Sequence, residues 1–298
     1  MRIFLTGATG FIGTEIVSQL LAAGHQVVGL TRSQQGADGL KAAGAEAHFG
    51  DIEDVDSLRR GAEACDGIIH TAFNHDFSTF VANCEQDRLV IQALGDALKG
   101  SQRPLIITSG VGMGAAGPNQ LAVEDHFNPA HPNPRKASEL AGEAALQKGI
   151  NVATVRLAQV HNPIKQGLIT PLIDVARQKG ISAWVEEGQN RWSAVHLRDA
   201  ARLYVLALEK NNPGSRYHAV AEEGVTLRQI AETIGHVLNL PVTRLDAVEA
   251  SAHFGWMSRF VAHDMSASSL LTRERLAWRP TGPGLLADLE QLPPITRN

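Results

Sequence analysis

Three glycines near the start of the chain constrain its fold more than any other feature. The segment Thr6-Gly-Ala-Thr-Gly-Phe-Ile-Gly13 follows a short apolar run that predicts a buried strand, and it leads into an amphipathic helix. In that setting Gly7 allows a tight turn, Gly10 lets the backbone approach a pyrophosphate, and Gly13 lets the helix pack closely on the strand. The helix N-terminus then directs free N–H groups and a partial positive charge at the anion. The spacing predicts a dinucleotide-binding turn, and the alternative is a glycine-rich turn without a ligand. The residues expected to contact the cofactor in this turn are Gly7, Thr9, Gly10, Phe11, Ile12 and Gly13.

The end of the second predicted strand indicates which cofactor is bound. This strand covers residues 26–30, and Arg32 and Ser33 follow it about 20 residues after the glycine turn. An acidic residue there would accept a hydrogen bond from the ribose 2′-hydroxyl and select NAD. A guanidinium beside a hydroxyl instead suits a 2′-phosphate. We therefore predict a preference for NADP(H), with NAD(H) as the alternative cofactor and a solvated loop arginine as the alternative role for Arg32.

Two further strand exits carry candidate cofactor contacts. Ligands of an open parallel sheet lie outside the carboxyl ends of its strands. Asp51 and Ile52 follow the third predicted strand, where the carboxylate would accept from the adenine amino group and the isoleucine would pack on its face. An N-cap for the next helix is the competing role for Asp51. Thr71, Ala72 and Phe73 follow the fourth strand, and the first two are small enough for a cofactor to lie across the strand end.

The order of the predicted elements defines the fold class. Strand and helix alternate six times within residues 1–160, which predicts an α/β fold with a Rossmann-type doubly wound parallel sheet. We assign residues 1–160 to an NADP(H)-binding domain. Residues 161–298 are expected to form a smaller substrate-binding lobe, interleaved with the C-terminal edge of the sheet as one structural unit. The pieces of this lobe look too few and scattered for a core of their own. Trp184 and Trp192 are expected either to line a substrate or to pack in the core, and Trp256 and Trp278 are expected to pack.

Composition narrows the function classes. The net charge is −4 and no run of Lys or Arg is present, so we expect a small-molecule substrate and no nucleic-acid partner. No apolar run reaches the roughly 18 residues of a membrane helix, and a strand at the N-terminus leaves no room for a signal peptide. Cys65 and Cys84 suit a reduced, cytoplasmic protein, and the histidine spacing predicts no metal site. A homodimer through the helix predicted from Phe77 to Lys99 is a further expectation.

Several segments together resemble one family. They are Thr6-Gly-Ala-Thr-Gly-Phe-Ile-Gly13, Gly50-Asp-Ile52, Val155-Arg-Leu-Ala-Gln-Val-His-Asn-Pro163, Val195-His-Leu-Arg-Asp-Ala200 and Leu276-Ala-Trp-Arg-Pro280. The set resembles the extended short-chain dehydrogenase/reductases, the NAD(P)-dependent epimerase/dehydratase group, and it spans nearly the whole chain. The resemblance implies this fold and cofactor class. It also implies that the nicotinamide amide passes Val160 and His161.

The catalytic pattern of that family is altered here. The family uses a tyrosine as general acid/base, followed four residues later by a lysine that lowers the tyrosine pKa and holds the nicotinamide ribose. The only tyrosines of this chain, Tyr204 and Tyr217, lie far downstream. Aligning the family's later glutamate on Glu139 places His131 at the tyrosine position and Arg135 at the lysine position. The chain therefore resembles the atypical members that lack the tyrosine–lysine pair.

The remaining polar groups define the catalytic hypothesis. Thr108 and Ser109 end the fifth strand, where the family places a hydroxyl that polarises the carbonyl. We predict Ser109, His131 and Arg135 as catalytic residues, with a loop role as the alternative for Ser109. His131 has a reference pKa near neutrality, but three prolines flank it, so a rigid surface turn competes with a proton-donor role. A third source of the proton is an acidic hydroxyl on the substrate itself.

The predicted function is an NADP(H)-dependent oxidoreductase that reduces a ketone or other carbonyl group on a small or polycyclic organic substrate. A redox-inactive NADP(H)-binding sensor is the first alternative. Sugar-nucleotide epimerisation or dehydration is the second. The missing tyrosine argues against the second alternative, because that chemistry oxidises an unactivated alcohol and needs a competent base.

Overall fold

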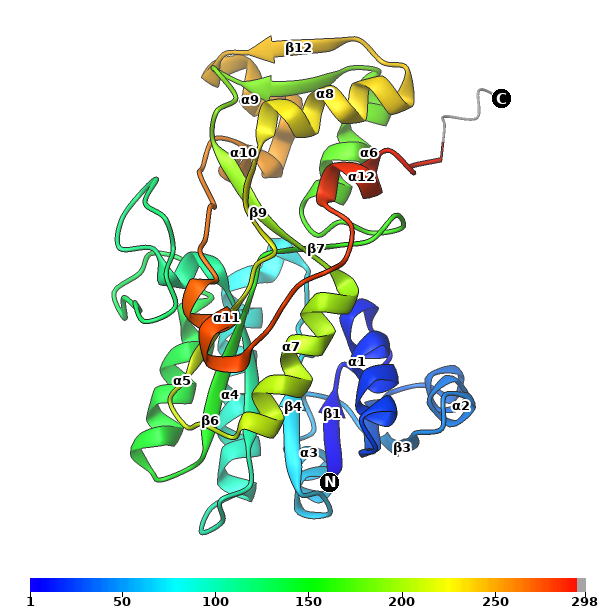
Figure 1. The fold of residues 1–298 in the computed structure, drawn as a ribbon, viewed down its shortest axis with the longest axis vertical. Coiled ribbons are helices and arrows are strands. Elements are labelled where there is room, and N and C mark those ends of the chain that lie inside the picture. The colour runs from blue at the N-terminus through cyan, green and yellow to red at the C-terminus, as the bar shows by residue number, and fades with distance from the viewer. Residues whose placement is uncertain (294–298) are drawn as a thin grey trace.

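A seven-stranded parallel sheet forms the larger part of the molecule (Figure 1). The computed structural model describes residues 1–293. The strand order is β10-β6-β5-β4-β1-β2-β3, with every neighbouring pair parallel. The strands are β1 (Arg2–Thr6), β2 (Gln26–Thr31), β3 (Glu46–Phe49), β4 (Gly67–His70), β5 (Leu105–Gly110), β6 (Val152–Leu157) and β10 (Arg216–Ala219). The predicted Rossmann-type fold is confirmed, and a seventh strand that the sequence did not reveal extends it.

Helices cover both faces of this sheet. The alternation of side chains along β1 shows how: Ile3 and Leu5 pack with one helical layer, and Phe4 packs with the other. The first layer contains α1 (Phe11–Ala22), α2 (Gln34–Ala42) and α7 (Leu197–Lys210). The second contains α3 (Val55–Glu63), α4 (Phe80–Ala97) and α5 (Lys136–Gln147). The helix predicted from Phe77 begins as a short 3₁₀ turn, η1 (Phe77–Thr79), before α4.

A second lobe lies beyond the carboxyl ends of the strands (Figure 1). It contains a sheet of β7 (Gln159–His161), β9 (Arg191–His196) and β11 (Glu222–Thr226), and a parallel pair of β8 (Ser182–Val185) and β12 (Val242–Leu245). Its helices are α6 (Ile169–Lys179), α8 (Leu227–Leu238), α9 (Ala247–Phe254), η3 (Gly255–Met257), α10 (Ser258–Val261) and α12 (Leu285–Leu289).

This outer lobe has a hydrophobic core of its own. Trp192, Ile230 and Met257 are fully buried in it, together with side chains from α6, α12 and β8. The expectation that these pieces are too few for a core is therefore wrong. Trp192 belongs to this core and donates its indole N–H to the His263 carbonyl at 3.2 Å, so it does not line a substrate site.

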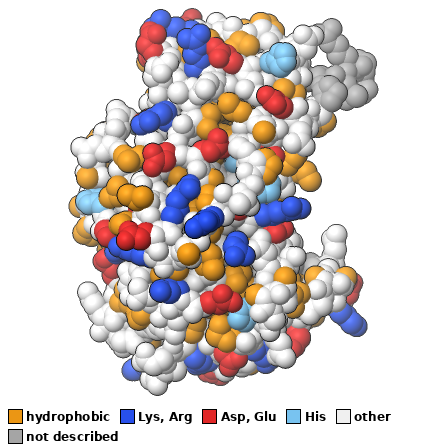
Figure 2. Space-filling model, in the orientation of Figure 1, with side chains coloured by type: hydrophobic (Ala, Val, Ile, Leu, Met, Phe, Trp, Pro, Cys, Tyr) orange, Lys and Arg blue, Asp and Glu red, His pale blue; other side chains and the backbone are white. Residues whose placement is uncertain are grey.

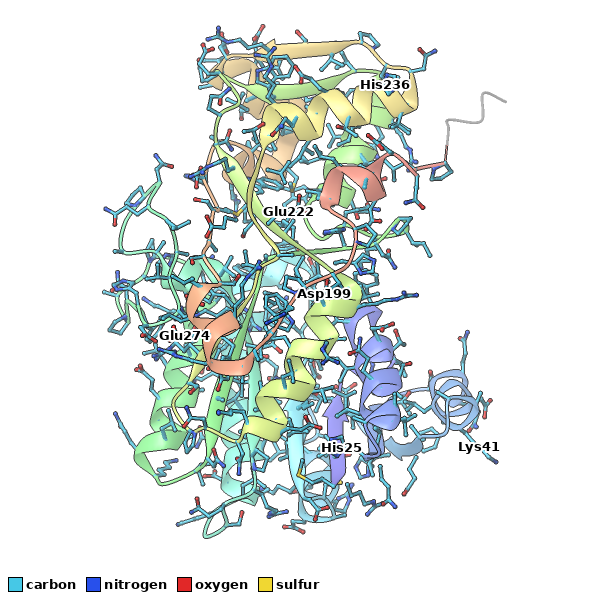
Figure 3. The ribbon with its side chains drawn as sticks, in the orientation of Figure 1. His25, Lys41, Asp199, Glu222, His236 and Glu274 are labelled. Atoms are coloured by element: carbon cyan, nitrogen blue, oxygen red, sulfur yellow. The ribbon has the colours of Figure 1, made fainter. Side chains whose placement is uncertain are left out.

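The C-terminal segment crosses from one lobe to the other and is held at two carboxylates. After α11 (Leu270–Leu276), the Asp199 carboxylate accepts from the Gly282 N–H at 2.7 Å. Glu222 accepts from the Leu285 N–H at 2.7 Å. Figure 3 shows both acidic residues beside this segment, Asp199 at the start of α7 and Glu222 near the crossing of the lobes. The first contact ties the segment to α7, and the second holds the start of α12 against β11 of the outer lobe.

On the side drawn in Figure 2, the surface has no large patch of positive or negative charge, because Lys and Arg side chains are mixed with Asp and Glu side chains. Among residues 1–293, no helix combines the length and the apolar character that crossing a membrane requires. Cys65 and Cys84 are buried and unpaired.

Candidate active site

The glycine turn has the shape of an anion cradle. Gly7 adopts φ +72°, and a Cβ there would lie 2.7 Å from Thr71 Oγ1 and 2.8 Å from the Ala72 nitrogen. A Cβ at Gly13 would collide with the Gly7 carbonyl oxygen, so α1 can pack against the turn only with glycine there. Gly10, the N-cap of α1, supplies no side-chain cap, and no acidic residue lies in the first turn. The N–H groups at this helix end therefore fit the pyrophosphate of a dinucleotide.

At the predicted adenosine end of the cofactor site, an arginine forms a loose ion pair. The Arg32 side chain is 80% exposed, and its Nη1 lies 3.6 Å from Asp51 Oδ2. Ser33 Oγ accepts from the Gly36 N–H and caps α2. Asp54, not Asp51, caps α3, so the Asp51 carboxylate has no N-cap role. An exposed pair at this distance contributes little stability, which leaves the guanidinium free to turn toward a phosphate.

The exits of β1 and β4 are joined by hydrogen bonds. Thr71 Oγ1 donates to the Thr6 carbonyl at 2.8 Å, and the Ala72 N–H donates to Thr6 Oγ1 at 3.3 Å. Ile52 packs against the α3–α4 side of the sheet as a half-buried side chain. The predicted contacts Thr71 and Ala72 therefore lie directly beside the glycine turn, and Phe73 follows them in the chain.

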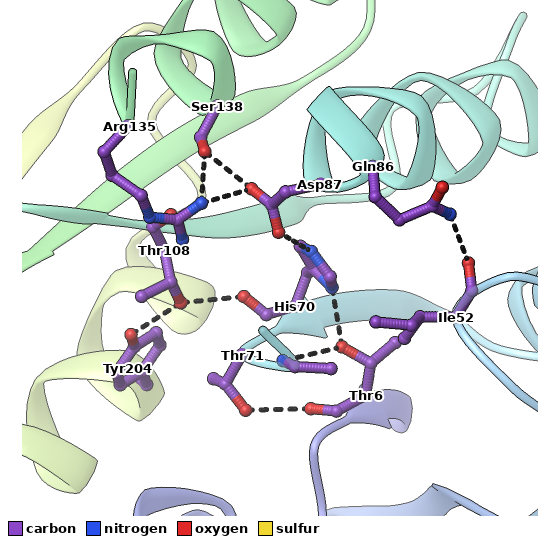
Figure 4. Close-up of polar contacts among 11 residues, drawn as sticks. Thr6, Ile52, His70, Thr71, Gln86, Asp87, Thr108, Arg135, Ser138 and Tyr204 are labelled. Carbon is purple, nitrogen blue, oxygen red and sulfur yellow. Dashed lines mark hydrogen bonds and ion pairs between the residues drawn. The ribbon is translucent and has the colours of Figure 1, made fainter. Parts of the chain in front are cut away.

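A buried polar network connects this region to α4 and α5 (Figure 4). The His70 ring lies between Thr6 Oγ1 at 2.7 Å and Asp87 Oδ1 at 3.0 Å. Asp87 Oδ2 accepts from Arg135 Nη1 and from Ser138 Oγ, both at 2.6 Å. Burial raises the pKa of the Asp87 carboxyl, but the Arg135 charge and the His70 hydrogen bond outweigh it and hold that pKa well below its usual range. Asp87 is therefore an anion inside the protein.

This network fixes the Arg135 guanidinium. Besides the ion pair with Asp87, Nη2 donates to the Thr108 carbonyl at 3.0 Å. One face of the group lies 4.0 Å from the centre of the Phe73 ring, and 14% of the side chain is exposed. Arg135 is thus a fixed cation at the end of β4, next to the predicted path of the cofactor.

The two hydroxyls at the end of β5 differ in their partners. Thr108 Oγ1 donates to the His70 carbonyl and also lies 2.7 Å from the Tyr204 hydroxyl. Tyr204 is fully buried, and burial raises the pKa of its hydroxyl well above the usual value. Ser109 is 3% exposed, and its Oγ has no hydrogen-bond partner within residues 1–293. Of the two hydroxyls, Ser109 is the one free to bind a ligand oxygen.

His161 makes a buried contact with the C-terminal helix. Its Nδ1 lies 2.6 Å from Asp288 Oδ2, whereas its Nε2 has no partner within the described chain. Burial lowers the pKa of His161 although Asp288 opposes this effect. Val160 is buried beside it in β7. The Nδ1 side of the His161 ring therefore faces α12, and its Nε2 and the backbone of these two residues remain for a cofactor.

A profile of the NAD dependent epimerase/dehydratase family matches residues 3–221. The chain belongs to this family. An uncharacterized protein of Schizosaccharomyces pombe is 47% identical over 97% of this chain and 98% of its own length. The 4-hydroxy-2-methyl-3-oxo-4-farnesyl-3,4-dihydroquinoline-1-oxide ketoreductase of Stigmatella aurantiaca is 28% identical over 86% of this chain and 80% of its own. The dTDP-glucose 4,6-dehydratase DesIV of Streptomyces venezuelae, solved with NAD bound, has the same fold, with a TM-score of 0.76, 21% identity, and coverage of 98% and 96% of the two chains.

Membership in the epimerase/dehydratase family establishes the cofactor class, since the family binds NAD(P). It includes reductases as well as epimerases and dehydratases, so it leaves the reaction open. Among residues 1–293, no group of three or more His, Cys, Asp and Glu side chains is placed to hold a metal ion.

His131 lies in a turn before α5, apart from the buried network. Its N–H donates to the Asn128 carbonyl at 3.0 Å, and its Nδ1 accepts from the Asn133 N–H at 3.1 Å. Burial, together with the Lys136 charge, lowers its pKa. The structure thus brings Ser109, Arg135 and Phe73 to one end of the sheet and gives His131 a structural hydrogen bond within its own turn.

Sequence reasoning missed three side chains at this site. His70 and Asp87 form the network behind Arg135, and His75 lies against Phe73 with a ring-centre distance of 5.2 Å. Burial lowers the pKa of His75, and the charges of Arg135 and Lys165 lower it further. Arg135 lies over the Phe73 ring and Lys165 lies 5.6 Å from the centre of the Phe11 ring, and both cations suit an anionic ligand. A carboxylate on the apolar side of the α4 pattern was the available signal for Asp87.

Proposed function

We propose that this protein is an NADP(H)-dependent reductase of a ketone or other carbonyl group on a small or polycyclic organic substrate. The observation that carries the proposal is the partnerless, buried Ser109 hydroxyl at the same sheet end as the fixed Arg135 guanidinium. Ser109 donates a hydrogen bond to the carbonyl oxygen and stabilises the negative charge that develops there. The nicotinamide, when bound, supplies the hydride.

The chain's own residues hold the cofactor in this proposal. The α1 N-terminus and the glycine turn bind the pyrophosphate, and their shape supports this role because side chains at Gly7 and Gly13 would collide with neighbouring protein atoms and distort the turn. Arg32 binds the 2′-phosphate, with NAD(H) as the alternative if the guanidinium stays on Asp51. Arg135 donates to the nicotinamide ribose from its fixed position.

The chemistry of the two residues favours reduction over epimerisation. A serine hydroxyl and a guanidinium both donate hydrogen bonds, and arginine does not release its proton in the working pH range. Donors stabilise an oxygen that gains negative charge, whereas oxidation of a sugar hydroxyl first requires a base that removes a proton. The similarity to a ketoreductase of a fused-ring ketone supports the same choice.

The test measures cofactor binding and turnover separately. Quenching of tryptophan fluorescence gives the affinity for NADPH and NADH, and the decrease of NADPH absorbance reports reduction of a panel of carbonyl compounds. Exchanging Ser109 for Ala should lower kcat by roughly 10²- to 10³-fold and leave the NADPH affinity unchanged. Ser251→Ala, at an exposed serine on α9, is the matched control. Tight NADPH binding with every carbonyl unreduced would instead support the redox-inactive sensor.

A further inference from the structure

Aromatic side chains of the two lobes meet above the start of α4. Phe77 of η1 stacks on Trp256 of η3, with ring centres 4.8 Å apart and planes inclined by 22°. Phe260 of α10 lies edge-on to both rings at 6.0 Å. Phe80 completes the group at 5.5 Å from Phe77. We name these four residues the aromatic bridge, because Phe77 and Phe80 belong to the sheet domain and Trp256 and Phe260 belong to the outer lobe.

The aromatic bridge is continuous with the candidate active site. Phe80 lies 6.2 Å from Phe73, and Phe73 carries the Arg135 guanidinium on its face at 4.0 Å. A row of rings therefore leads from the fixed cation at the end of β4 to the outer lobe. Each step is a ring-to-ring contact within the range of favourable aromatic pairs.

Both ends of the bridge are held by rigid supports. The Asp76 side chain accepts from the Ser78 N–H at 2.9 Å, and Asn83 donates to the Asp76 carbonyl at 2.8 Å, which fixes the turn that carries Phe77. On the other side, Phe254 and Met257 are buried in the outer-lobe core at 4% and 0% exposure. The turn between them nevertheless presents Trp256 with 44% of its surface exposed.

Trp256 is buried less completely than the large aromatic side chains of the outer-lobe core, such as Phe254 and Trp192. A large aromatic side chain that folding alone selects is buried more completely, because its apolar area dominates its energetics. Trp256 packs as expected, on Phe77 and Phe260, and its exposed surface leaves it able to contact a ligand as well. A half-exposed indole on an anchored turn, next to a row of rings that ends at the active site, is typical of a binding surface.

We propose that the aromatic bridge is the wall of the substrate site that selects planar, apolar carbonyl compounds, which stack on the exposed face of Trp256 while Phe77 supports its other face. The inference rests on the proposed carbonyl reductase. Flat rings match flat substrates by offset stacking. Among residues 1–293, no Lys or Arg lies over the rings of Phe77, Phe80, Trp256 or Phe260, whereas Arg135 lies over Phe73 at the cofactor end. The faces of the bridge rings thus remain open as apolar contact area for a fused-ring ketone.

The experiment compares two diketones that differ in planar area. NADPH oxidation is followed without oxygen, with 9,10-phenanthrenequinone as the planar probe and 2,3-butanedione as the small one. Trp256→Ala and Phe77→Ala should each raise the KM for phenanthrenequinone by about tenfold, which corresponds to ~1.4 kcal/mol of lost stacking energy. The KM for butanedione should change by less than about twofold in either variant. Trp184→Ala is the matched control, because Trp184 stacks under Arg228 at 5.2 Å in the outer lobe.

A calorimetric titration of phenanthrenequinone into the NADP⁺-saturated protein separates this inference from the proposed function. If neither diketone is reduced, the reductase proposal fails. An affinity for phenanthrenequinone that Phe77→Ala weakens about tenfold would still support the aromatic bridge as a binding surface. Equal changes in KM for both diketones would overturn the proposed role of the aromatic bridge. Unchanged KM and affinity for phenanthrenequinone in both bridge variants would overturn it as well. Melting temperatures verify folding, and Trp256→Leu with Phe77→Leu replaces any alanine variant that does not fold.

Discussion

The ion pair between Asp87 and Arg135 gives the sharpest test of how this site is built. Exchanging Asp87 for Asn keeps the shape of the side chain and removes its charge. The Asp87 oxygens accept from Arg135 Nη1, from Ser138 Oγ and at 3.0 Å from the His70 ring. An asparagine offers one oxygen and one NH₂ group, so at least one of these donors would face another N–H. Arg135 would then be a cation without its anion.

The size of the effect follows from burial. Asp87 is 2% exposed and Arg135 is 14% exposed, so water replaces little of the lost interaction. Removing one partner of a buried ion pair costs about 3–5 kcal/mol, and we expect the lower end because Arg135 keeps the Thr108 carbonyl and the Phe73 ring. A loss of about 3 kcal/mol lowers the melting temperature of a chain of this size by roughly 5–10 °C.

The assay is thermal unfolding, supplemented by NADPH affinity. Glu85→Gln is the matched control, because Glu85 lies on the same helix, is 55% exposed and, within residues 1–293, forms its one ion pair with Arg88. That change should cost less than about 1 kcal/mol. The double variant Asp87→Asn with Arg135→Gln should regain most of the lost stability, since no unpaired charge remains, while its NADPH affinity stays weak. A melting temperature for Asp87→Asn no lower than that of Glu85→Gln would refute the reasoning.

Three further predictions test other parts of the structure. Arg32→Asp should weaken NADPH binding roughly 10- to 100-fold more than NADH binding in fluorescence titrations, and equal losses would refute the assignment of the 2′-phosphate. Burial and Arg156 lower the pKa of His218 from 6.5 to about 3, so the unfolded chain binds the extra proton and stability falls as pH drops from 6.5 toward 3. His218→Gln should flatten that fall in urea unfolding, and His263→Gln, at an exposed site, should not. Val81 and Leu89 on α4 are 69% and 41% exposed, and we expect a homodimer there that Val81→Glu with Leu89→Glu converts to a monomer in sedimentation; a monomeric parent would contradict this.

The sheet could be predicted where local signals and the fold agree. The glycine turn, the apolar strands and their helices each carry their own pattern, and α8 begins at a capping box formed by Thr226 and Gln229. The strand β10 was missed because Arg216 and His218 interrupt its apolar pattern. Both are tied to buried partners, since Arg216 donates to Glu139 at 3.1 Å and His218 lies 3.1 Å from Arg156. Polar residues satisfied by distant partners do not reveal a strand locally.

The candidate site likewise has features that the sequence could predict and features that it could not. Backbone features such as Gly7 and Gly13 could be predicted, because only glycine fits a turn of that shape. The network of His70 and Asp87 could not, because each looks like an ordinary polar residue in its own element and gains its role only when β4 and α4 pack together. The aromatic bridge was missed for the same reason, since Phe77 and Trp256 meet only across the two lobes.

If Arg135 takes the lysine position of the family, as the alignment on Glu139 predicts, its pair with Asp87 gives the site a different character from the tyrosine–lysine pattern. A lysine that lowers a tyrosine pKa must act as an uncompensated charge on that hydroxyl. Here the cation at this position is permanently charged, and a buried carboxylate neutralises it at 2.6 Å. Such a pair exerts little field on a distant acid, but it holds its remaining N–H groups in fixed directions. The site is therefore organised to position donors around an oxygen atom, and the proton must come from a group outside this network.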